Sequence, residues 1–404
     1  MTPLLPLDEA RRILLDGHGA LGSEIVSLAD ASGRTLAENV TARHDQPPAP
    51  TSAMDGYAVR AADSMQGARL RLVGEAPAGA PFAGLLGPGE CVKIATGGIV
   101  PDGADRIVIQ ENVASAGGVV TIVDSSGPPF VRPAAMDFAY GQILVEAGQR
   151  LGPAAIGLIA AAGLAEVAVA RRPRVAILAA GDELRDPGQP LAPGAIYNSA
   201  TFALEALVEE WGAIAIRPVV LPDDLDRIVS AIRTLEDSAD LIVPLGGASV
   251  GTRDLFRPAF EMVGAKMLFW GINVVPGKPC WHARLADGRP VLGLPGNPSS
   301  AFVCAHLLLR PLIDLCLGRD PAPSMALQIA TLTDAIGENG AREAWLRAHV
   351  AIDAAGRALT TVDPRQDSGL QTPLLSANAL VRRLPFSAPC AAGSTVQFLP
   401  FSRP

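Results

Sequence analysis

The sequence has few of the features that mark secreted, membrane or nucleic-acid-binding proteins. It has five cysteines, which are widely scattered, with no Cys-x-x-Cys pair and no Cys/His spacing suited to zinc. No run of about 18 uncharged apolar residues predicts a membrane span, and the N-terminal residues lack a charged segment followed by an apolar core. The net charge of −8 disfavours a nucleic-acid or anionic membrane surface as partner. We therefore expect a cytoplasmic protein with buried free thiols.

Composition and missing motifs limit the class of protein further. Hydrophobic residues make up 49% of the 404 positions and charged residues 18%, which is typical of a globular protein with about two to four domains. Neither a Walker A motif nor a His-Glu-x-x-His motif occurs, so an ordinary P-loop hydrolase and a zinc protease of that type are disfavoured. Any anionic ligand must be held locally rather than by a broad positive field.

The first half of the chain predicts a scaffold interrupted by a small β domain. We expect Asp8 to cap a short helix that runs to Leu15, and residues 23–31 to form a second helix. Prolines between residues 44 and 52 mark a domain boundary. A helix near residues 153–162 returns the chain to the scaffold. Between the proline-rich boundary and this helix, short apolar runs separated by turns predict strands at 70–73, 90–94, 106–109 and 118–123.

The second half alternates strands with amphipathic helices. Apolar residues at helical spacing follow Leu204 and Leu225, and strand-like runs occupy 174–179, 215–221 and 241–245. This alternation predicts βαβ units and a doubly wound α/β domain. Ligands of such sheets bind beyond the carboxyl ends of the strands. The turns rich in glycine, proline and carboxylates are expected at that edge: 181–183, 222–224, 246–254, 276–279 and 293–300.

The turn after the strand at 241–245 predicts a phosphate site. The glycines between 246 and 251 let the backbone bring its N–H groups close to an anion, and the segment from Leu255 offers a helix N-terminus. Carboxylates near such amides provide the oxygen ligands that Mg²⁺ takes. An ordinary strand-to-helix turn is the alternative, and helix N-capping is an alternative role for three nearby acids: Asp182, Asp223 and Asp224.

Three polar groups in the first half are weaker candidates. Asp55 precedes Gly56, and an Asp-Gly hairpin turn explains it equally well. Thr96 precedes two glycines, where a simple turn is the alternative. Asp137 is either a buried functional acid or a surface residue at a strand end.

The residues beyond Pro321 predict a separate C-terminal β domain. Arg342 and Arg347 lie near its start, and we expect both to be surface charges. Its strands are expected at 326–332, 345–352, 379–384 and 395–399.

Six motifs in order over nearly the whole chain resemble the molybdopterin molybdenumtransferase (MoeA) family, which includes the E domain of gephyrin. They are Ser52-Ala-Met-Asp-Gly-Tyr-Ala58, Thr96-Gly-Gly with Pro101-Asp-Gly-Ala-Asp105, Gly181-Asp-Glu-Leu184, Gly246-Gly-Ala-Ser-Val-Gly251 with Asp254, Pro276-Gly-Lys-Pro279 and Gly293-Leu-Pro-Gly-Asn-Pro298.

The resemblance implies four domains and a homodimer whose active site lies between two subunits. The expected domains are a split scaffold at 1–45 and 141–172, a small β domain at 46–140, an α/β molybdopterin-binding domain at 173–320 and a C-terminal β-barrel-like domain at 321–404. The implied reaction is Mg²⁺-dependent: adenylylated molybdopterin and molybdate react, and AMP leaves. The molybdopterin adenylyltransferase is a candidate partner.

Site residues follow from the same resemblance. The expected metal ligands are Asp55, Asp137, Glu183 and Asp254, and the expected catalytic residues are Asp55, Thr96, Asp137 and Lys278. The expected contacts to molybdopterin are Gly246, Gly247, Ser249, Gly251, Pro276, Gly277, Gly296, Asn297 and Ser299.

The sequence departs from the family at several polar positions. The usual Gly-Glu-Asp is Ala135-Met136-Asp137, a usual threonine is Ala180, a usual asparagine is Ala200, and a basic or polar residue is Val275. Two hypotheses therefore stand. The chain is an active molybdenum insertase, or it is a divergent paralogue that binds the cofactor or a protein partner without catalysis. An adenylyltransferase is disfavoured because that activity does not need the flanking domains.

Overall fold

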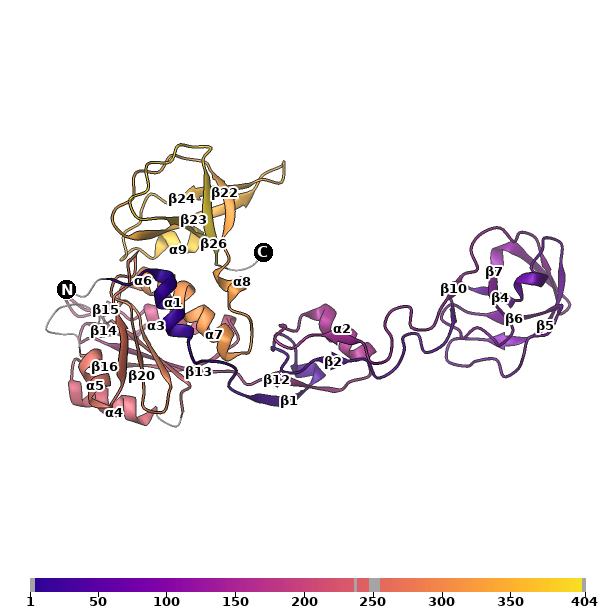
Figure 1. Cartoon of the computed structure of the whole chain (residues 1–404), viewed down its shortest axis with the longest axis horizontal. Helices are drawn as coiled ribbons and strands as arrows, with labels where there is room; N and C mark the ends of the chain where they lie inside the picture. Colours follow the sequence, from indigo (N-terminus) through magenta and orange to yellow (C-terminus); the bar gives the residue numbers. More distant parts are fainter. Residues whose placement is uncertain (1–3, 236–237, 247–254, 402–404) are drawn as a thin grey trace. The chain divides into compact units, whose positions relative to one another are not determined.

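The computed structural model describes residues 4–235, 238–246 and 255–401, apart from the side chains of residues 217 and 218. The chain forms two compact units (Figure 1). Unit 1 comprises Met1–Glu24, Gly33–Ala37 and Val169–Pro404, and unit 2 comprises Ile25–Ser32 and Glu38–Ala168. The finer four-domain division stays a prediction.

A six-stranded sheet dominates unit 2, in the order β7-β4-β6-β5-β9-β8. Its pairs are antiparallel except for β5 with β6. Side chains alternate between two apolar clusters, because Tyr57 and Val59 face one and Ala58 faces the other. The strands expected at 90–94 and 106–109 are confirmed. The bounds are β4 (Gly56–Val59), β5 (Arg69–Ala76), β6 (Glu90–Ile94), β7 (Arg106–Ile109), β8 (Val113–Ala116) and β9 (Val119–Ile122).

Short antiparallel pairs and one helix complete unit 2. The strand β2 pairs with β11, and β3 pairs with β10. A small cluster of Ala42, Phe138 and Ala162 is buried beside them. The helix expected near 153–162 is confirmed. The bounds are β2 (Val40–Thr41), β3 (Thr51–Ser52), β10 (Val131–Arg132), β11 (Ile143–Val145) and α2 (Pro153–Ala161).

Two expectations for the N-terminal residues were wrong. The helix α1 (Leu7–Leu15) begins one residue before Asp8, and Pro6 occupies its N-cap without a side-chain cap bond. Residues 23–31 form no α-helix: β1 (Ser23–Ser27) pairs with β12 (Glu166–Ala170), and a single 3-10 turn follows. The β-branched Ile25 and Val26 favour a strand, and pairing with β12 satisfies the backbone there.

The main sheet of unit 1 has the order β16-β13-β17-β21-β20-β18 and confirms the predicted α/β domain. The first four strands are mutually parallel, whereas β20 is antiparallel to both neighbours. Its elements are β13 (Arg174–Ala180), α3 (Ala200–Glu210), β16 (Ile214–Leu221), α4 (Leu225–Thr234), β17 (Leu241–Leu245), α5 (Phe256–Met262), β18 (Lys266–Trp270), β20 (Trp281–Arg284), β21 (Pro290–Gly293), α6 (Pro298–Cys304) and α7 (Arg310–Cys316).

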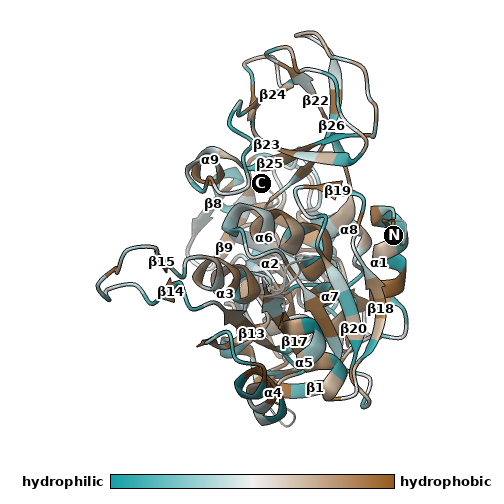
Figure 2. Cartoon of the chain, turned by 90° about the vertical axis from the view of Figure 1, so that its left-hand side faces the viewer, coloured by the Kyte–Doolittle hydropathy of each residue, from teal (hydrophilic) through white to brown (hydrophobic). Residues whose placement is uncertain are grey.

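Helices cover both faces of this sheet. Alternate residues of β13 point to opposite faces of the sheet. Val175 and Ile177 pack with α1, α3, α6 and α7, whereas Ala176 and Leu178 pack with α4 and α5. Brown, hydrophobic colour accordingly predominates along β13, β17 and α7 in Figure 2. A strand covered on both faces needs apolar residues throughout, as β17 has.

The C-terminal residues of unit 1 form a closed β-barrel, as expected. Its strands pair in the order β23-β24-β22-β26-β25, and β25 returns to β23. The short strand β19 (Val274–Val275) adds to β23 from the α/β side. The bounds are α8 (Ala322–Met325), β22 (Gln328–Leu332), β23 (Glu343–Ile352), β24 (Ala358–Val362), α9 (Thr372–Ser376), β25 (Ala379–Arg383) and β26 (Thr395–Pro400).

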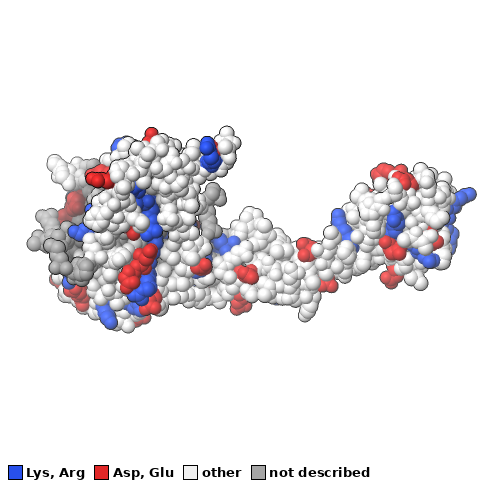
Figure 3. All heavy atoms as spheres, turned by 45° about the horizontal axis from the view of Figure 1, so that its top comes forward, with Lys and Arg blue, Asp and Glu red and all other residues white. Residues whose placement is uncertain are grey.

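One continuous helical segment, Pro298–Cys316, is long and apolar enough to pass a test for a membrane span. Since 83% of its most apolar window is buried inside the protein, it is a core helix of unit 1. Four of the five cysteines are buried and all five are free, as expected, with Cys390 half-buried. On the face drawn in Figure 3, positive and negative side chains lie beside one another.

Candidate functional site

Four parallel strands bring their following loops to one edge of the sheet in unit 1. The strand β13 pairs in parallel with β16 and β17, and β17 pairs in parallel with β21. Their carboxyl ends therefore meet, followed by the loops that begin at Gly181, Pro222, Gly246 and Leu294. Backbone bonds join two of these loops, from Gly246 N to the Leu294 carbonyl (3.0 Å) and from Leu294 N to the Pro244 carbonyl (2.9 Å).

A cavity of about 630 Å³ opens at this edge. Its volume lies within the usual range for small-molecule sites, which is about 300–1,000 Å³. The lining combines apolar, glycine and polar residues: Ala179, Ala180, Gly181, Glu183, Leu184, Ile196, Tyr197, Asn198, Ser199, Ala200, Asp223, Leu245, Gly246, Pro279, Pro295, Gly296, Asn297 and Pro298.

Two glycines are required where the loops meet in the cavity wall. Gly246 has a φ of 83°, in the left-handed region that side-chain-bearing residues avoid. A Cβ atom on Gly296 would lie 3.2 Å from the Gly246 Cα atom, so the two backbones approach closely. Both glycines thus expose backbone to the cavity. The predicted Gly247, Ser249, Gly251 and Asp254 lie outside the described residues.

The carboxylates at this edge take different roles. Asp224 caps α4, accepting the Arg227 N–H at 3.0 Å. Asp182 accepts the backbone N–H of Asp223 at 3.2 Å instead of capping a helix. Glu183 and Asp223 line the cavity, and neither forms an ion pair within the described residues of unit 1. The carboxylate of Glu183 lies over Gly181, where a Cβ atom would be only 2.7 Å from Oε2.

The Pro276-Gly277-Lys278-Pro279 loop borders the same cavity through Pro279. A Cβ atom on Gly277 would lie 2.6 Å from the Cys304 Sγ atom, so the loop packs tightly on α6. Lys278 is exposed. Val275 belongs to β19 and pairs with Ala344 of β23.

Ser299 and Arg347 are in direct contact. Ser299 is fully buried, and its hydroxyl accepts a hydrogen bond from Arg347, so its predicted contact with molybdopterin stays a prediction. The expectation that Arg347 is a surface charge was wrong, because only 2% of this residue is exposed. Arg342 is half-buried and donates to the Val274 carbonyl at 3.2 Å.

In unit 2, the predicted residues Asp55 and Thr96 are hydrogen-bonded to each other. The Thr96 backbone N–H and hydroxyl both donate to Oδ1 of Asp55, at 2.6 and 2.9 Å. These bonds, the backbone one first, hold the pKa of Asp55 below its usual value, because they stabilise the ionised carboxylate. Asp137 is exposed rather than buried, and its expected role as a metal ligand and catalytic residue stays a prediction. The predicted acids are thus divided: Asp55 and Asp137 belong to unit 2, and Glu183 belongs to unit 1.

Several cavity residues were not singled out from the sequence. Tyr197, Asn198 and Ser199 come from the end of a long loop between β13 and α3. This loop contains two short strands that pair in parallel, β14 (Leu184–Arg185) and β15 (Ile196–Tyr197). The only sequence signal was the glycine- and proline-rich stretch between them. For Arg347, the available signal was its place two residues after the buried Trp345 on one strand.

Family models match three successive parts of the chain. They are described as the MoeA N-terminal region (domain I and II) over residues 5–163, a probable molybdopterin binding domain over 176–314 and the MoeA C-terminal region (domain IV) over 330–401. The candidate cavity falls within the second match.

Curated relatives and solved structures agree with these matches. A molybdopterin molybdenumtransferase of Haemophilus influenzae is 32% identical over 99% of both chains, and a molybdopterin molybdenumtransferase 2 of Mycobacterium tuberculosis is 33% identical over 97% of this chain and 98% of its own. A molybdopterin biosynthesis moeA protein from Pyrococcus horikoshii has a TM-score of 0.85 at 30% identity, with 99% of this chain and 100% of that chain covered.

The Asp55 contact predicts a measurable titration change. Replacing Thr96 by valine removes the hydroxyl donor but keeps the backbone one, so the pKa of Asp55 should rise part of the way to its usual value. Because the pKa of Asp55 is lower in the folded state, its ionised carboxylate stabilises the fold at pH values above the unfolded-state pKa. This stabilisation is lost as the pH falls through the folded-state pKa. Carboxyl-detected NMR titration measures this, with Asp124, whose pKa is lowered by Ser126, as internal control. An unshifted Asp55 would contradict the assignment.

Replacing Ala135 by glycine is expected to stabilise the fold. Ala135 has a φ of 56°, which strains a residue that carries a Cβ atom by about 1–2 kcal/mol. Ala135→Gly relieves this strain but adds about 0.4–1 kcal/mol of unfolded-state entropy, so a net stabilisation of about 0.5–1 kcal/mol is expected. Ala134→Gly is the matched control, because Ala134 has no positive φ and should only lose stability. Calorimetric unfolding measures the change in stability of each variant. A change of the same sign in both variants would contradict the strain assigned to Ala135.

Proposed function

Because the chain belongs to the molybdopterin molybdenumtransferase family, a family of transferases, we propose that it inserts molybdate into adenylylated molybdopterin and releases AMP. The observation that supports this most is the 630 Å³ cavity at the carboxyl edge of the parallel sheet, where glycine backbone, carboxylates and apolar side chains meet. The general role, molybdenum cofactor biosynthesis, follows from the full-length relatives.

The two kinds of cavity wall suit the two parts of such a ligand. The apolar side chains of Leu184 and Ile196 would contact the flat pterin ring, whose burial is favourable. The backbone at Gly246 and Gly296 would approach the phosphates, since glycine lets amides come close to an anion. Lys278, exposed beside the cavity edge, would add a cation for molybdate or phosphate oxygens.

The donor set at the cavity fits a hard divalent cation. Glu183 and Asp223 supply oxygen donors that are not consumed by an ion pair in the described part of unit 1. The described residues contain no group of three or more His, Cys, Asp or Glu side chains that could hold a metal ion, so the remaining ligands must come from outside this group of residues. We assign the completion to Asp254 and to Asp55 and Asp137 of a second copy of the chain. Bound Mg²⁺ would neutralise charge on the phosphate oxygens.

Side chains of unit 2 would contact the water molecule or molybdate that takes part in the reaction. The two hydrogen bonds from Thr96 fix the orientation of the Asp55 carboxylate and stabilise its charge, so it can orient a water molecule or a cation near molybdate. The division of the acids between two units is the reason to propose a homodimer with a shared site. We place this dimer in the cytoplasm, supplied by an adenylyltransferase.

One observation favours a second candidate, a paralogue that binds without catalysis. Ala180 and Ala200, at positions where the family usually has threonine and asparagine, both line the cavity. Two polar side chains are therefore missing from the wall that would contact the substrate. Binding of molybdopterin without AMP release would support this candidate.

Incubation with adenylylated molybdopterin, Mg²⁺ and molybdate decides between the two. We expect AMP release that stops with a chelator and returns with added Mg²⁺. Glu183→Gln should lower the rate by about tenfold or more, because a lost charged ligand weakens both the ion and its alignment. Glu210→Gln, an equivalent change at an exposed position of α3 away from the lining, is the control. Release that is unaffected by the chelator would refute the metal requirement.

A further inference from the structure

One loop of the C-terminal barrel reaches the rim of the cavity. The loop 363–371, named the rim loop, connects β24 to α9. Two side-chain hydrogen bonds join it to the α/β part of unit 1: Gln371 Nε2 donates to Ser199 Oγ at 3.0 Å, and Asn297 Nδ2 donates to Ser368 Oγ at 2.8 Å. Ser199 and Asn297 both line the cavity. The barrel therefore contacts the ligand site through this loop.

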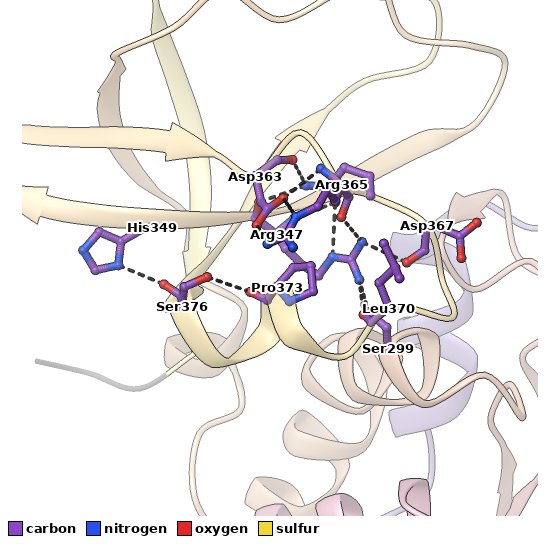
Figure 4. Close-up of polar contacts among 10 residues, drawn as sticks. Ser299, Arg347, His349, Asp363, Arg365, Asp367, Leu370, Pro373 and Ser376 are labelled. Atoms are coloured by element: carbon purple, nitrogen blue, oxygen red, sulfur yellow. Dashed lines mark hydrogen bonds and ion pairs between the residues drawn. The ribbon is translucent and has the colours of Figure 1, made fainter. Parts of the chain in front are cut away.

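Arg347 of β23 fixes the shape of the rim loop. Its guanidinium has five N–H donors and bonds to five acceptors. These are Ser299 Oγ, the Leu370 carbonyl at 2.9 Å, the Arg365 carbonyl at 2.8 Å, the Asp367 carbonyl at 3.0 Å and Gln366 Oε1 at 3.3 Å. Figure 4 shows the guanidinium among Ser299, Arg365, Asp367 and Leu370. Since every donor is used and the residue is buried, Arg347 holds the loop and has no donor left for a ligand.

Ser199 and Asn297 occupy helix N-cap positions without acting as side-chain caps. Ser199 precedes α3 and Asn297 precedes α6, and neither side chain accepts a hydrogen bond from its own helix. Serine and asparagine at these positions ordinarily accept the N–H of the second or third helical residue. Here both side chains instead bond to the rim loop.

The Gln371 bond determines what Ser199 can offer to a ligand. A hydroxyl has one proton and can accept through its lone pairs. Because Ser199 Oγ accepts the amide N–H of Gln371, its own proton remains available to an acceptor in the cavity. We infer that Gln371 is a positioning residue, which makes Ser199 a hydrogen-bond donor toward the pterin-bearing substrate, and that Arg347 maintains this arrangement. This inference rests on the proposed function.

The probe for the test is molybdopterin, bound anaerobically in equilibrium dialysis to the full-length chain. Gln371→Ala should weaken binding by about three- to tenfold, the range for one net hydrogen bond. Gln371→Glu keeps the size but supplies a carboxylate that accepts the Ser199 proton, so binding should weaken at least as much. Gln397→Ala, an exposed position on β26 of the same barrel, is the matched control and should bind like the unchanged chain.

A double-mutant cycle separates positioning from a general structural effect. In a Ser199→Ala chain, Gln371→Ala should cause no further loss, because its effect acts through the hydroxyl. Equal losses in both backgrounds, or no loss in either, would overturn the inference. An unchanged chain that fails to bind molybdopterin would refute the proposed function itself. Unfolding transitions matching that of Gln397→Ala verify that each variant is folded.

Discussion

The parallel pairing of four strands is the constraint on which the candidate site depends. Since β13, β16, β17 and β21 run in the same direction, loops from distant parts of the sequence meet at one edge. The pairing also buries β13, β17 and β21 on both faces, so their side chains pack in the core and the chemistry is left to the loops. Gly246 and Gly296 then allow two loops to touch, which creates the cavity wall.

An acidic chain must bind its anionic ligand by local means. The net charge is −8, and the proposed phosphate contacts come from backbone at glycine turns, from one exposed lysine and from a cation held by carboxylates. The carboxylates proposed as ligands are divided between the two units, so the proposed set needs both. Activity at the proposed site would depend on the assembly of two copies as much as on the fold of one chain.

Regular elements could be predicted well from the sequence, whereas the roles of single polar side chains could not. The strand at 241–245 and the helix from Leu225 had patterns that matched their burial. Residues 23–31 were wrongly predicted as helix because their pairing with β12 involves a segment about 140 residues away. Arg347 was missed because its five acceptors are mostly carbonyls of a loop, which no residue pattern specifies.

The shared site is tested most directly by mixing two inactive chains, Asp55→Ala and Glu183→Ala. If each site combines unit 2 of one copy with unit 1 of the other, half of randomly formed dimers are mixed and each has one intact site, so about a quarter of the unchanged AMP release should return. Mixed dimers that form but release no AMP would contradict a site completed by two copies of the chain.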